Sequence, residues 1–196
     1  MLHIVDDEEV IRDALCWLAQ SRGIDAAAYD SADAFLNMLE GRPQFDPGGD
    51  CLLLDIRMPV TSGIALFETL DTRALTARVP VIFLTGHGDV PMAVSALKRG
   101  AFDFFEKPFN DNTLMDRVEE ALAASRSAGV SAAVHVRLAA LSAREREVLD
   151  LILEGKMNKV IADCLGISMR TVEVHRAHIF DKMNVKTAVE LARLLK

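Results

Sequence analysis

The chain has 196 residues, of which 51% are hydrophobic, and a formal net charge of −7. With a mean hydropathy of +0.19, this composition excludes a disordered chain and suffices for one large or two small globular domains. No apolar run is long enough to cross a membrane, and three widely spaced cysteines argue against a disulfide or zinc framework. The N-terminus turns acidic before a signal-peptide pattern develops, so we expect a cytoplasmic protein with no membrane partner.

The two halves of the chain carry opposite charge. Residues 1–126 have a net charge of −10, from 11 basic and 21 acidic side chains. Residues 127–196 have a net charge of +3, from 11 basic and 8 acidic side chains, which completes the total of −7. Such asymmetry favours an acidic regulatory module joined to one that can approach an anionic polymer.

In the first half, short apolar strands alternate with amphipathic helices. The strands are predicted at residues 2–5, 24–29, 51–54, 79–84 and 102–105. A helix follows each strand; the fourth spans residues 90–99, and either Asn110 or Asp111 caps the fifth. Five strand–helix units in series predict an α/β fold, a five-stranded doubly wound parallel sheet with right-handed crossovers.

Polar residues follow these strands at the carboxyl edge of the sheet, where ligands bind in folds of this kind. They are Asp6, Asp7, Asp55, Thr85 and Lys107. Clustered carboxylates repel one another unless a hard cation neutralises them, so the set predicts a Mg²⁺ site. With a phosphoryl group, Asp55 becomes the nucleophile, and Thr85 and Lys107 bond the other oxygens. Each residue alone is also explained as a helix cap, a first-turn charge or a solvated lysine, but five in register favour the site.

These residues resemble the receiver domains of two-component response regulators, over about residues 1–124. The resemblance implies a flavodoxin-like fold in which Asp55 accepts a phosphoryl group from a histidine of a partner kinase. It implies that Mg²⁺ is held by Asp6, Asp7, Asp55 and the backbone carbonyl of Arg57. It also implies a cis peptide bond before Pro108.

The resemblance further implies a switch built from Thr85 and Phe104. Phosphorylation adds roughly −1.5 to −2 charges at Asp55, which draws the Thr85 hydroxyl inward and lets Phe104 fill the vacated space. This remodels helix 90–99 and the fifth strand, the face on which such receivers usually dimerise. We interpret His87 as a loop residue, because receivers take the phosphoryl group from a histidine of the kinase.

Residues 125–140 are rich in Ala, Ser and Gly and are predicted to form the linker. They are either flexible or part of one helix over 113–139 that is interrupted or merely weakened at Gly129. Four helices follow: one opened by a capping box of Ser142 and Glu145, one from Asn158, one over 169–183 and one over 187–195. Two helices around a glycine-containing turn predict a helix-turn-helix, although a small helical packing module has the same pattern.

The third of these helices carries the candidate DNA contacts, which are Arg170, Thr171, Glu173, Val174, His175, Arg176 and His178. Lys159, Lys182 and Lys186 are predicted at phosphates, which position a protein without specifying sequence. The residues from Leu141 to Arg176 resemble the LuxR-type DNA-binding domain, and the whole chain resembles the FixJ branch of response regulators. Several relatives have lysine where Glu173 stands, so base preference is not transferred.

The sequence therefore predicts a phosphorylation-controlled transcription factor with a receiver at 1–124, a linker at 125–140 and a DNA-binding domain at 141–196. The resemblance implies no enzyme activity beyond phosphoryl acceptance and slow dephosphorylation. Expected partners are a sensor histidine kinase, a two-fold symmetric site on double-stranded DNA and a second copy of the chain, with RNA polymerase as a further candidate.

Two alternatives remain open. One is a phosphorylation-independent DNA-binding regulator or adaptor, which the intact acidic pair and Lys107 argue against. The other is a small phosphatase with Asp55 as nucleophile, which lacks a second acid two positions on because Arg57 stands there.

Overall fold

The computed structural model describes residues 1–41, 45–86 and 90–195. The chain separates into two compact units, Met1–Gly129 and Val130–Lys196. Each unit has its own hydrophobic core, and each is described by itself below.

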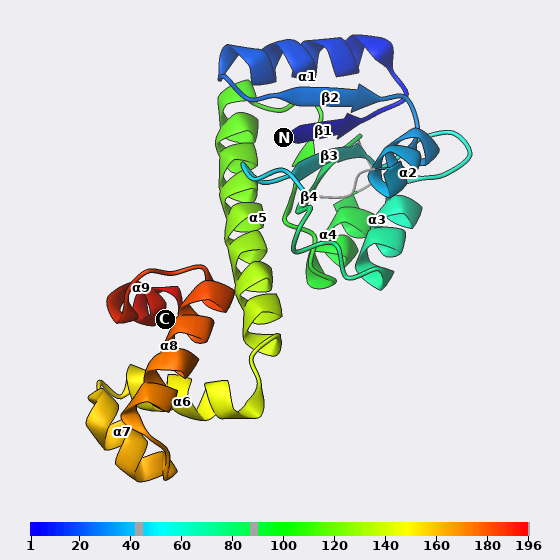
Figure 1. The fold of residues 1–196 in the computed structure, drawn as a ribbon. Coiled ribbons are helices and arrows are strands. Elements are labelled where there is room, and N and C mark those ends of the chain that lie inside the picture. Colours follow the sequence, from blue (N-terminus) through cyan, green and yellow to red (C-terminus); the bar gives the residue numbers. More distant parts are fainter. Residues whose placement is uncertain (42–44, 87–89, 196) are drawn as a thin grey trace. The chain divides into compact units, whose positions relative to one another are not determined.

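The first unit is built on a five-stranded sheet (Figure 1). Its strands are β1 (Leu2–Val5), β2 (Ala26–Tyr29), β3 (Cys51–Asp55), β4 (Val81–Thr85) and β5 (Asp103–Glu106). All neighbouring strands are parallel, in the order β2-β1-β3-β4-β5. This confirms the predicted parallel sheet, with the fully buried β3 at its centre.

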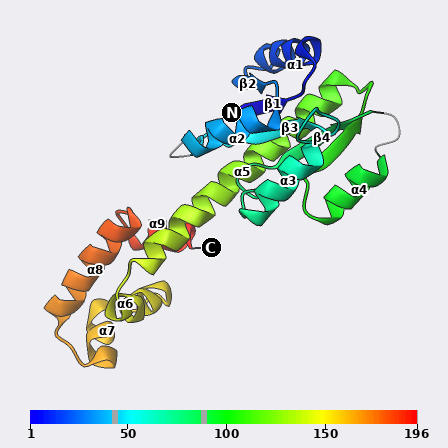
Figure 2. The ribbon, with the colours of Figure 1, turned by 90° about the vertical axis from the view of Figure 1, so that its right-hand side faces the viewer.

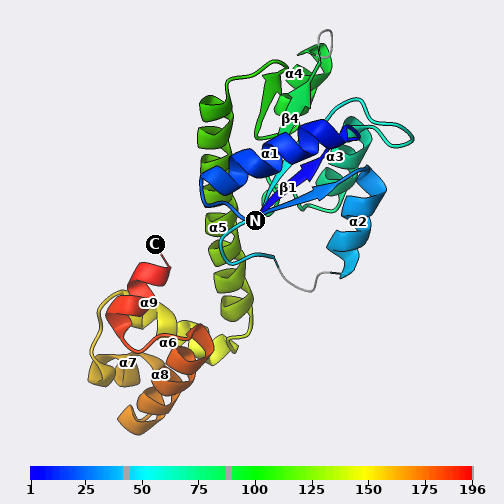
Figure 3. The ribbon, with the colours of Figure 1, turned by 90° about the horizontal axis from the view of Figure 1, so that it is seen from above.

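Helices cover both faces of this sheet. They are α1 (Glu9–Ser21), α2 (Ala32–Gly41), α3 (Gly63–Thr72), α4 (Val90–Lys98) and α5 (Asp111–Ala139). One core cluster joins α1 and the first half of α5 to the sheet, and the other joins α2, α3 and α4 to the opposite face. Figure 2 shows α3 and α4 together, and Figure 3 looks down on α1 where it lies over the sheet.

Two predicted strands begin later than their apolar runs. The Ile24 amide donates to the Ala19 carbonyl at 3.0 Å, and the Val79 amide donates to the Leu75 carbonyl at 2.8 Å. Ile24 therefore closes the end of α1 (Glu9–Ser21), Val79 belongs to the turn that follows α3 (Gly63–Thr72), and β2 and β4 start two residues further on. Of the two residues predicted to cap the fifth helix, Asn110 is the cap of α5, because its Oδ1 accepts from the Thr113 amide at 3.1 Å.

Helix α5 is unbroken from Asp111 to Ala139, so no interruption occurs at Gly129. At this position a Cβ would come within 2.1 Å of Arg78 Nη1, so a larger residue would require that guanidinium to move. Most of the predicted linker is thus helical, and the division between the two units falls within this helix.

The second unit gathers its helices into a small bundle (Figure 1). They are α6 (Ala143–Leu153), α7 (Asn158–Leu165), α8 (Met169–Met183) and α9 (Ala188–Leu194). The capping box of Ser142 and Glu145 opens α6, and Gly166 ends α7 with a φ of 63° in the left-handed region. Among the described residues, no helix is both long and apolar enough to span a membrane.

Candidate functional site

Asp55 stands at the end of β3, and the residue is only 7% exposed. Lys107 reaches it from the segment after β5: its Nζ lies 2.7 Å from Asp55 Oδ1 and 2.9 Å from Asp6 Oδ2. One ammonium thus joins two carboxylates that are 49 positions apart in the sequence. The fold brings together three of the predicted site residues, because their strands end at the same edge of a parallel sheet.

Burial and charge oppose one another at this site. Burial raises the pKa of the Asp55 carboxyl and the charge of Asp6 adds to the increase, against the hydrogen bond from Lys107, which lowers it. For Lys107, burial lowers the pKa, but the hydrogen bonds to Asp55 and Asp6 outweigh it and the net direction is upward. The ammonium therefore stays charged and holds the two carboxylates together.

The other predicted residues surround this pair. Thr85 ends β4; its side chain is fully buried, and Oγ1 has no hydrogen-bond partner in the described part of the chain. Its carbonyl accepts from the Lys107 amide at 2.7 Å. Asp7 is exposed beside Asp6, and Phe104 is half-buried against the core cluster of α3 and α4. The Lys107–Pro108 peptide bond is cis, as expected, whereas His87 lies outside the described residues.

The backbone after Asp55 turns sharply around the carboxylate. The Arg57 amide donates to Asp55 Oδ2 at 2.6 Å, and the Gly63 amide donates to the Ile56 carbonyl at 3.0 Å. A Cβ on Gly63 would lie 2.0 Å from the Asp55 carbonyl oxygen. Gly63 is a site residue that sequence reasoning missed; the turn-forming residues Thr61 and Ser62 before it were the available signal.

The donors at this edge suit a hard cation. The carboxylates of Asp6 and Asp55 and the carbonyl of Arg57 are oxygen ligands of the type that Mg²⁺ prefers. Over residues 1–41, 45–86 and 90–195, no three Asp, Glu, His or Cys side chains converge into a ready metal cluster. Here Lys107 supplies the neutralising charge between Asp6 and Asp55. The unpartnered Thr85 hydroxyl leaves a hydrogen bond to be made by a further oxygen ligand.

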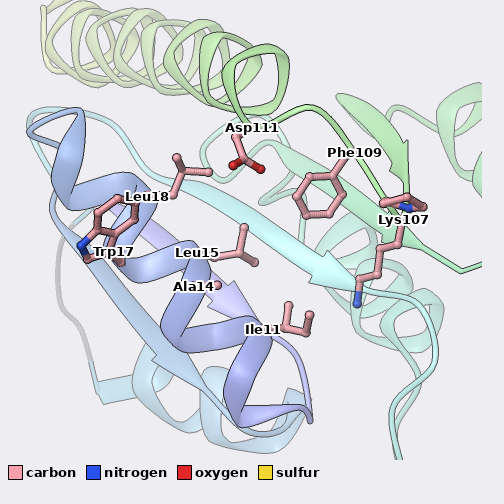
Figure 4. A pocket seen from close by; sticks show the side chains of 9 residues that line it. Ile11, Ala14, Leu15, Trp17, Leu18, Lys107, Phe109 and Asp111 are labelled. Carbon is pink, nitrogen blue, oxygen red and sulfur yellow. The ribbon is translucent and has the colours of Figure 1, made fainter.

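An apolar groove of about 770 Å³ adjoins the site. Figure 4 shows α1 side chains on one side of it, with Phe109 and Lys107 on the other. Its lining is Ile11, Ala14, Leu15, Trp17, Leu18, Lys107, Pro108, Phe109 and Asp111. Trp17 is 71% exposed, which is unusual for so large an apolar side chain. The groove and the carboxylate pair share Lys107, so the groove adjoins the carboxyl edge of the sheet.

In the second unit, α8 buries one face and exposes the other. Val172, Ile179 and Met183 are buried in the core. Of the predicted DNA contacts, Arg170, Glu173, Val174 and His178 are exposed, and Thr171, His175 and Arg176 are half-buried. Thr171 Oγ1 lies 2.8 Å from the hydroxyl of Ser168, which caps the helix. Lys159 is exposed on α7, whereas the Lys182 ammonium lies 2.7 Å from Glu145 Oε2.

The family comparisons match both units. The profile of the response regulator receiver domain matches residues 2–119, and that of the bacterial regulatory proteins of the luxR family matches residues 139–195. The C4-dicarboxylate transport transcriptional regulatory protein DctR of Rhodobacter capsulatus is 50% identical over 197 residues, covering 98% of each chain. This chain belongs to the response regulators. The transcriptional regulatory protein FixJ of Azorhizobium caulinodans is 43% identical, over 98% of this response regulator and 90% of FixJ.

Solved structures agree with this assignment. The response regulator StyR matches with a TM-score of 0.68 at 38% identity, over 99% of this chain and 96% of that one. The chain is thus a two-component response regulator with a receiver and a LuxR-type DNA-binding domain, as the sequence predicted.

Proposed function

We propose that this response regulator accepts a phosphoryl group on Asp55 from a phosphohistidine of a partner sensor kinase. The histidine N–P bond breaks, a bond forms between phosphorus and an Asp55 carboxylate oxygen, and the imidazole leaves. The observation that carries the proposal is the Lys107 ammonium between Asp55 and Asp6, beside the buried and unpartnered Thr85 hydroxyl. A carboxylate held in this way is positioned for attack, and its environment can neutralise added charge.

The chain's own residues have separate roles in this reaction. Lys107 moves its hydrogen bond from the carboxylate to a phosphoryl oxygen, and Thr85 donates to another. Asp6, Asp7, Asp55 and the Arg57 carbonyl would hold Mg²⁺, which when bound neutralises charge on the phosphoryl oxygens. Gly63 keeps the turn close to the Asp55 backbone, so the carboxylate cannot drift from the sheet edge.

The groove between α1 and the segment after β5 is the surface we assign to the kinase. The donor histidine must approach Asp55 from the carboxyl edge of the sheet, and the groove meets that edge at Lys107. An exposed Trp17 over an apolar lining suits the apolar face of a partner helix.

Phosphorylation then controls dimerisation and DNA binding in this proposal. The Thr85 hydroxyl turns towards the phosphoryl group, and Phe104, half-buried at β5, packs into the released space. The receiver dimerises on the face of α4 and β5, and two copies of α8 bind a two-fold symmetric site to regulate transcription.

The first test is phosphoryl acceptance from a small donor. Acetyl phosphate with Mg²⁺ should add the mass of one phosphoryl group to the wild type and nothing to Asp55→Asn, with Glu8→Gln as the matched control. Equal labelling of wild type and Asp55→Asn would overturn the assignment of Asp55.

The second test is assembly. Beryllofluoride with Mg²⁺ should shift the molar mass from monomer to dimer by light scattering in the wild type and not in Asp55→Asn. If the wild type neither dimerises nor gains affinity for DNA, the phosphorylation-independent regulator or adaptor becomes the better description.

A further inference from the structure

The last two turns of α5 are part of the core of the second unit. Val134 is 8% exposed, and Leu138 packs against the same cluster, which also contains Val172 and Met183 of α8. The same helix carries Leu114 to Leu122 in the core of the first unit. One helix therefore contributes to both cores, and its far end lies against α8.

The carboxyl ends of α5 and α8 cap one another. Arg137 of α5 donates from Nη1 to the Met183 carbonyl at 3.2 Å. In return, Lys182 of α8 donates from Nζ to the Ala140 carbonyl at 3.2 Å. The last carbonyls of a helix have no intrahelical partner and carry partial negative charge, so a cation at each end stabilises both helices.

Lys182 is also the partner of a buried carboxylate. Glu145 is 4% exposed, and its Oε2 accepts from Lys182 Nζ at 2.7 Å and from the Ser142 amide at 2.7 Å. A buried carboxylate without a cation is costly, which holds Lys182 in place. The Lys182 side chain is 40% exposed, but its ammonium is engaged by the Glu145 carboxylate and the Ala140 carbonyl, whereas the sequence predicted that it contacts a DNA phosphate.

We propose that Lys182 and Arg137 are positioning residues of the DNA-recognition helix: they fix the carboxyl end of α8 to the end of α5, and Lys182 makes no phosphate contact. The proposal rests on DNA binding by α8. The sequence instead assigned Lys182 to a DNA phosphate. The salt dependence of DNA affinity distinguishes the two assignments, because each phosphate neutralised by a protein cation releases condensed counterions.

The deciding experiment uses the full chain and a labelled mixed-sequence DNA duplex. Affinity is measured against salt concentration for wild type, Lys182→Met and Lys159→Met, where the control Lys159 is exposed on α7 as Lys182 is on α8. Lys182→Met should leave the slope of log affinity against log salt unchanged, and Lys159→Met should reduce its magnitude by about 0.9. A reduction of about 0.9 in Lys182→Met would overturn the proposal.

Hydrogen exchange tests the same contacts without DNA. Lys182→Met and Arg137→Met should each speed amide exchange about tenfold at residues 134–141 and 176–184, because a charge-assisted cap is lost. Lys182→Arg should keep the protection, and Lys159→Met should not change it. If Lys182→Met alone unfolds, the double variant Glu145→Gln with Lys182→Met replaces it in the measurement, because it leaves no unpaired carboxylate in the core. Unchanged exchange at 134–141 in every variant would reject the positioning role, whereas a wild type that binds no duplex would reject only the proposed DNA binding.

Discussion

The two units place their charged groups in opposite ways. In the receiver, Asp6 and Asp55 are buried and joined by one lysine, so their positions follow from the sheet. In the DNA-binding unit, the candidate contacts of α8 are exposed or half-buried, and no single buried ion among the described residues joins them. Glu145 is a buried carboxylate of this unit, but the side chain of its partner Lys182 is 40% exposed. The positions of buried charged side chains are thus fixed by the fold itself. Exposed charged side chains take their final contacts only when a partner binds.

The largest effect should come from removing the cation that the receiver carboxylates share. Lys107→Met leaves Asp6 and Asp55 close together without it, so we expect a loss of about 3 kcal/mol in the free energy of unfolding and loss of phosphoryl acceptance. Urea unfolding at neutral pH measures the first, and mass spectrometry after acetyl phosphate measures the second. Adding Asp55→Asn to Lys107→Met should restore most of the stability. If Lys107→Met lowers the free energy of unfolding no more than the exposed control Lys98→Met does, the Lys107 ammonium does not stabilise the two carboxylates.

A steric change at the same edge should have the next largest effect. Gly63→Ala places a methyl group against the Asp55 carbonyl oxygen, so the turn after β3 must move and unfolding should become easier by about 2 kcal/mol. Gly41→Ala is the matched control, since nothing lies within 4 Å of its Cβ position. Equal unfolding midpoints for the two variants would show that the close approach at Gly63 carries no cost.

The receiver site was predictable because topology forces it. Strands ending in Asp6, Asp55 and Thr85 must meet at one edge once the sheet is parallel, whatever the packing detail. The role of Gly63 was not predicted, because it depends on a backbone distance that no residue pattern encodes. The unbroken α5 was one of two open alternatives, because an Ala- and Ser-rich segment is compatible with helix and coil alike.

Lys182 shows a different limit of the sequence. Its partner Glu145 lies 37 positions away, so spacing along α8 alone predicted a phosphate contact and could not show this ion pair. The capping box identified Glu145 as a helix start but gave no sign of the cation that would bind it. The residues of α8 that face solvent could be named from helical periodicity, but their targets on DNA remain a prediction.

The Glu145 pair gives the DNA-binding unit a dependence on pH. Its hydrogen bond with Lys182 is the main reason that the pKa of Glu145 falls to about 2, from an ordinary 4.5. The unfolded chain therefore takes up the proton more readily, and the stability from ionised Glu145 is complete above about pH 4.5 and is lost as the pH falls towards about 2. Hydrogen exchange of α6 between these values should be less pH-dependent in Glu145→Gln than in wild type. The exposed Glu147→Gln serves as control, and parallel profiles for all three would contradict the pairing.

The smallest effect concerns an exposed position that is nevertheless constrained. Val60, in the loop after Asp55, is fully exposed and has a φ of 65°, a conformation that is unfavourable for a β-branched residue. Asparagine tolerates this region, so Val60→Asn should raise the free energy of unfolding by about 1 kcal/mol. Val10→Asn is the control, because Val10 is 78% exposed but lies in α1, where the two residues have similar helix propensity. If only Val60→Asn raises the urea midpoint, the backbone conformation constrains which residue is stable at this exposed position. If both substitutions leave the midpoint unchanged, the positive φ of Val60 has no cost in stability.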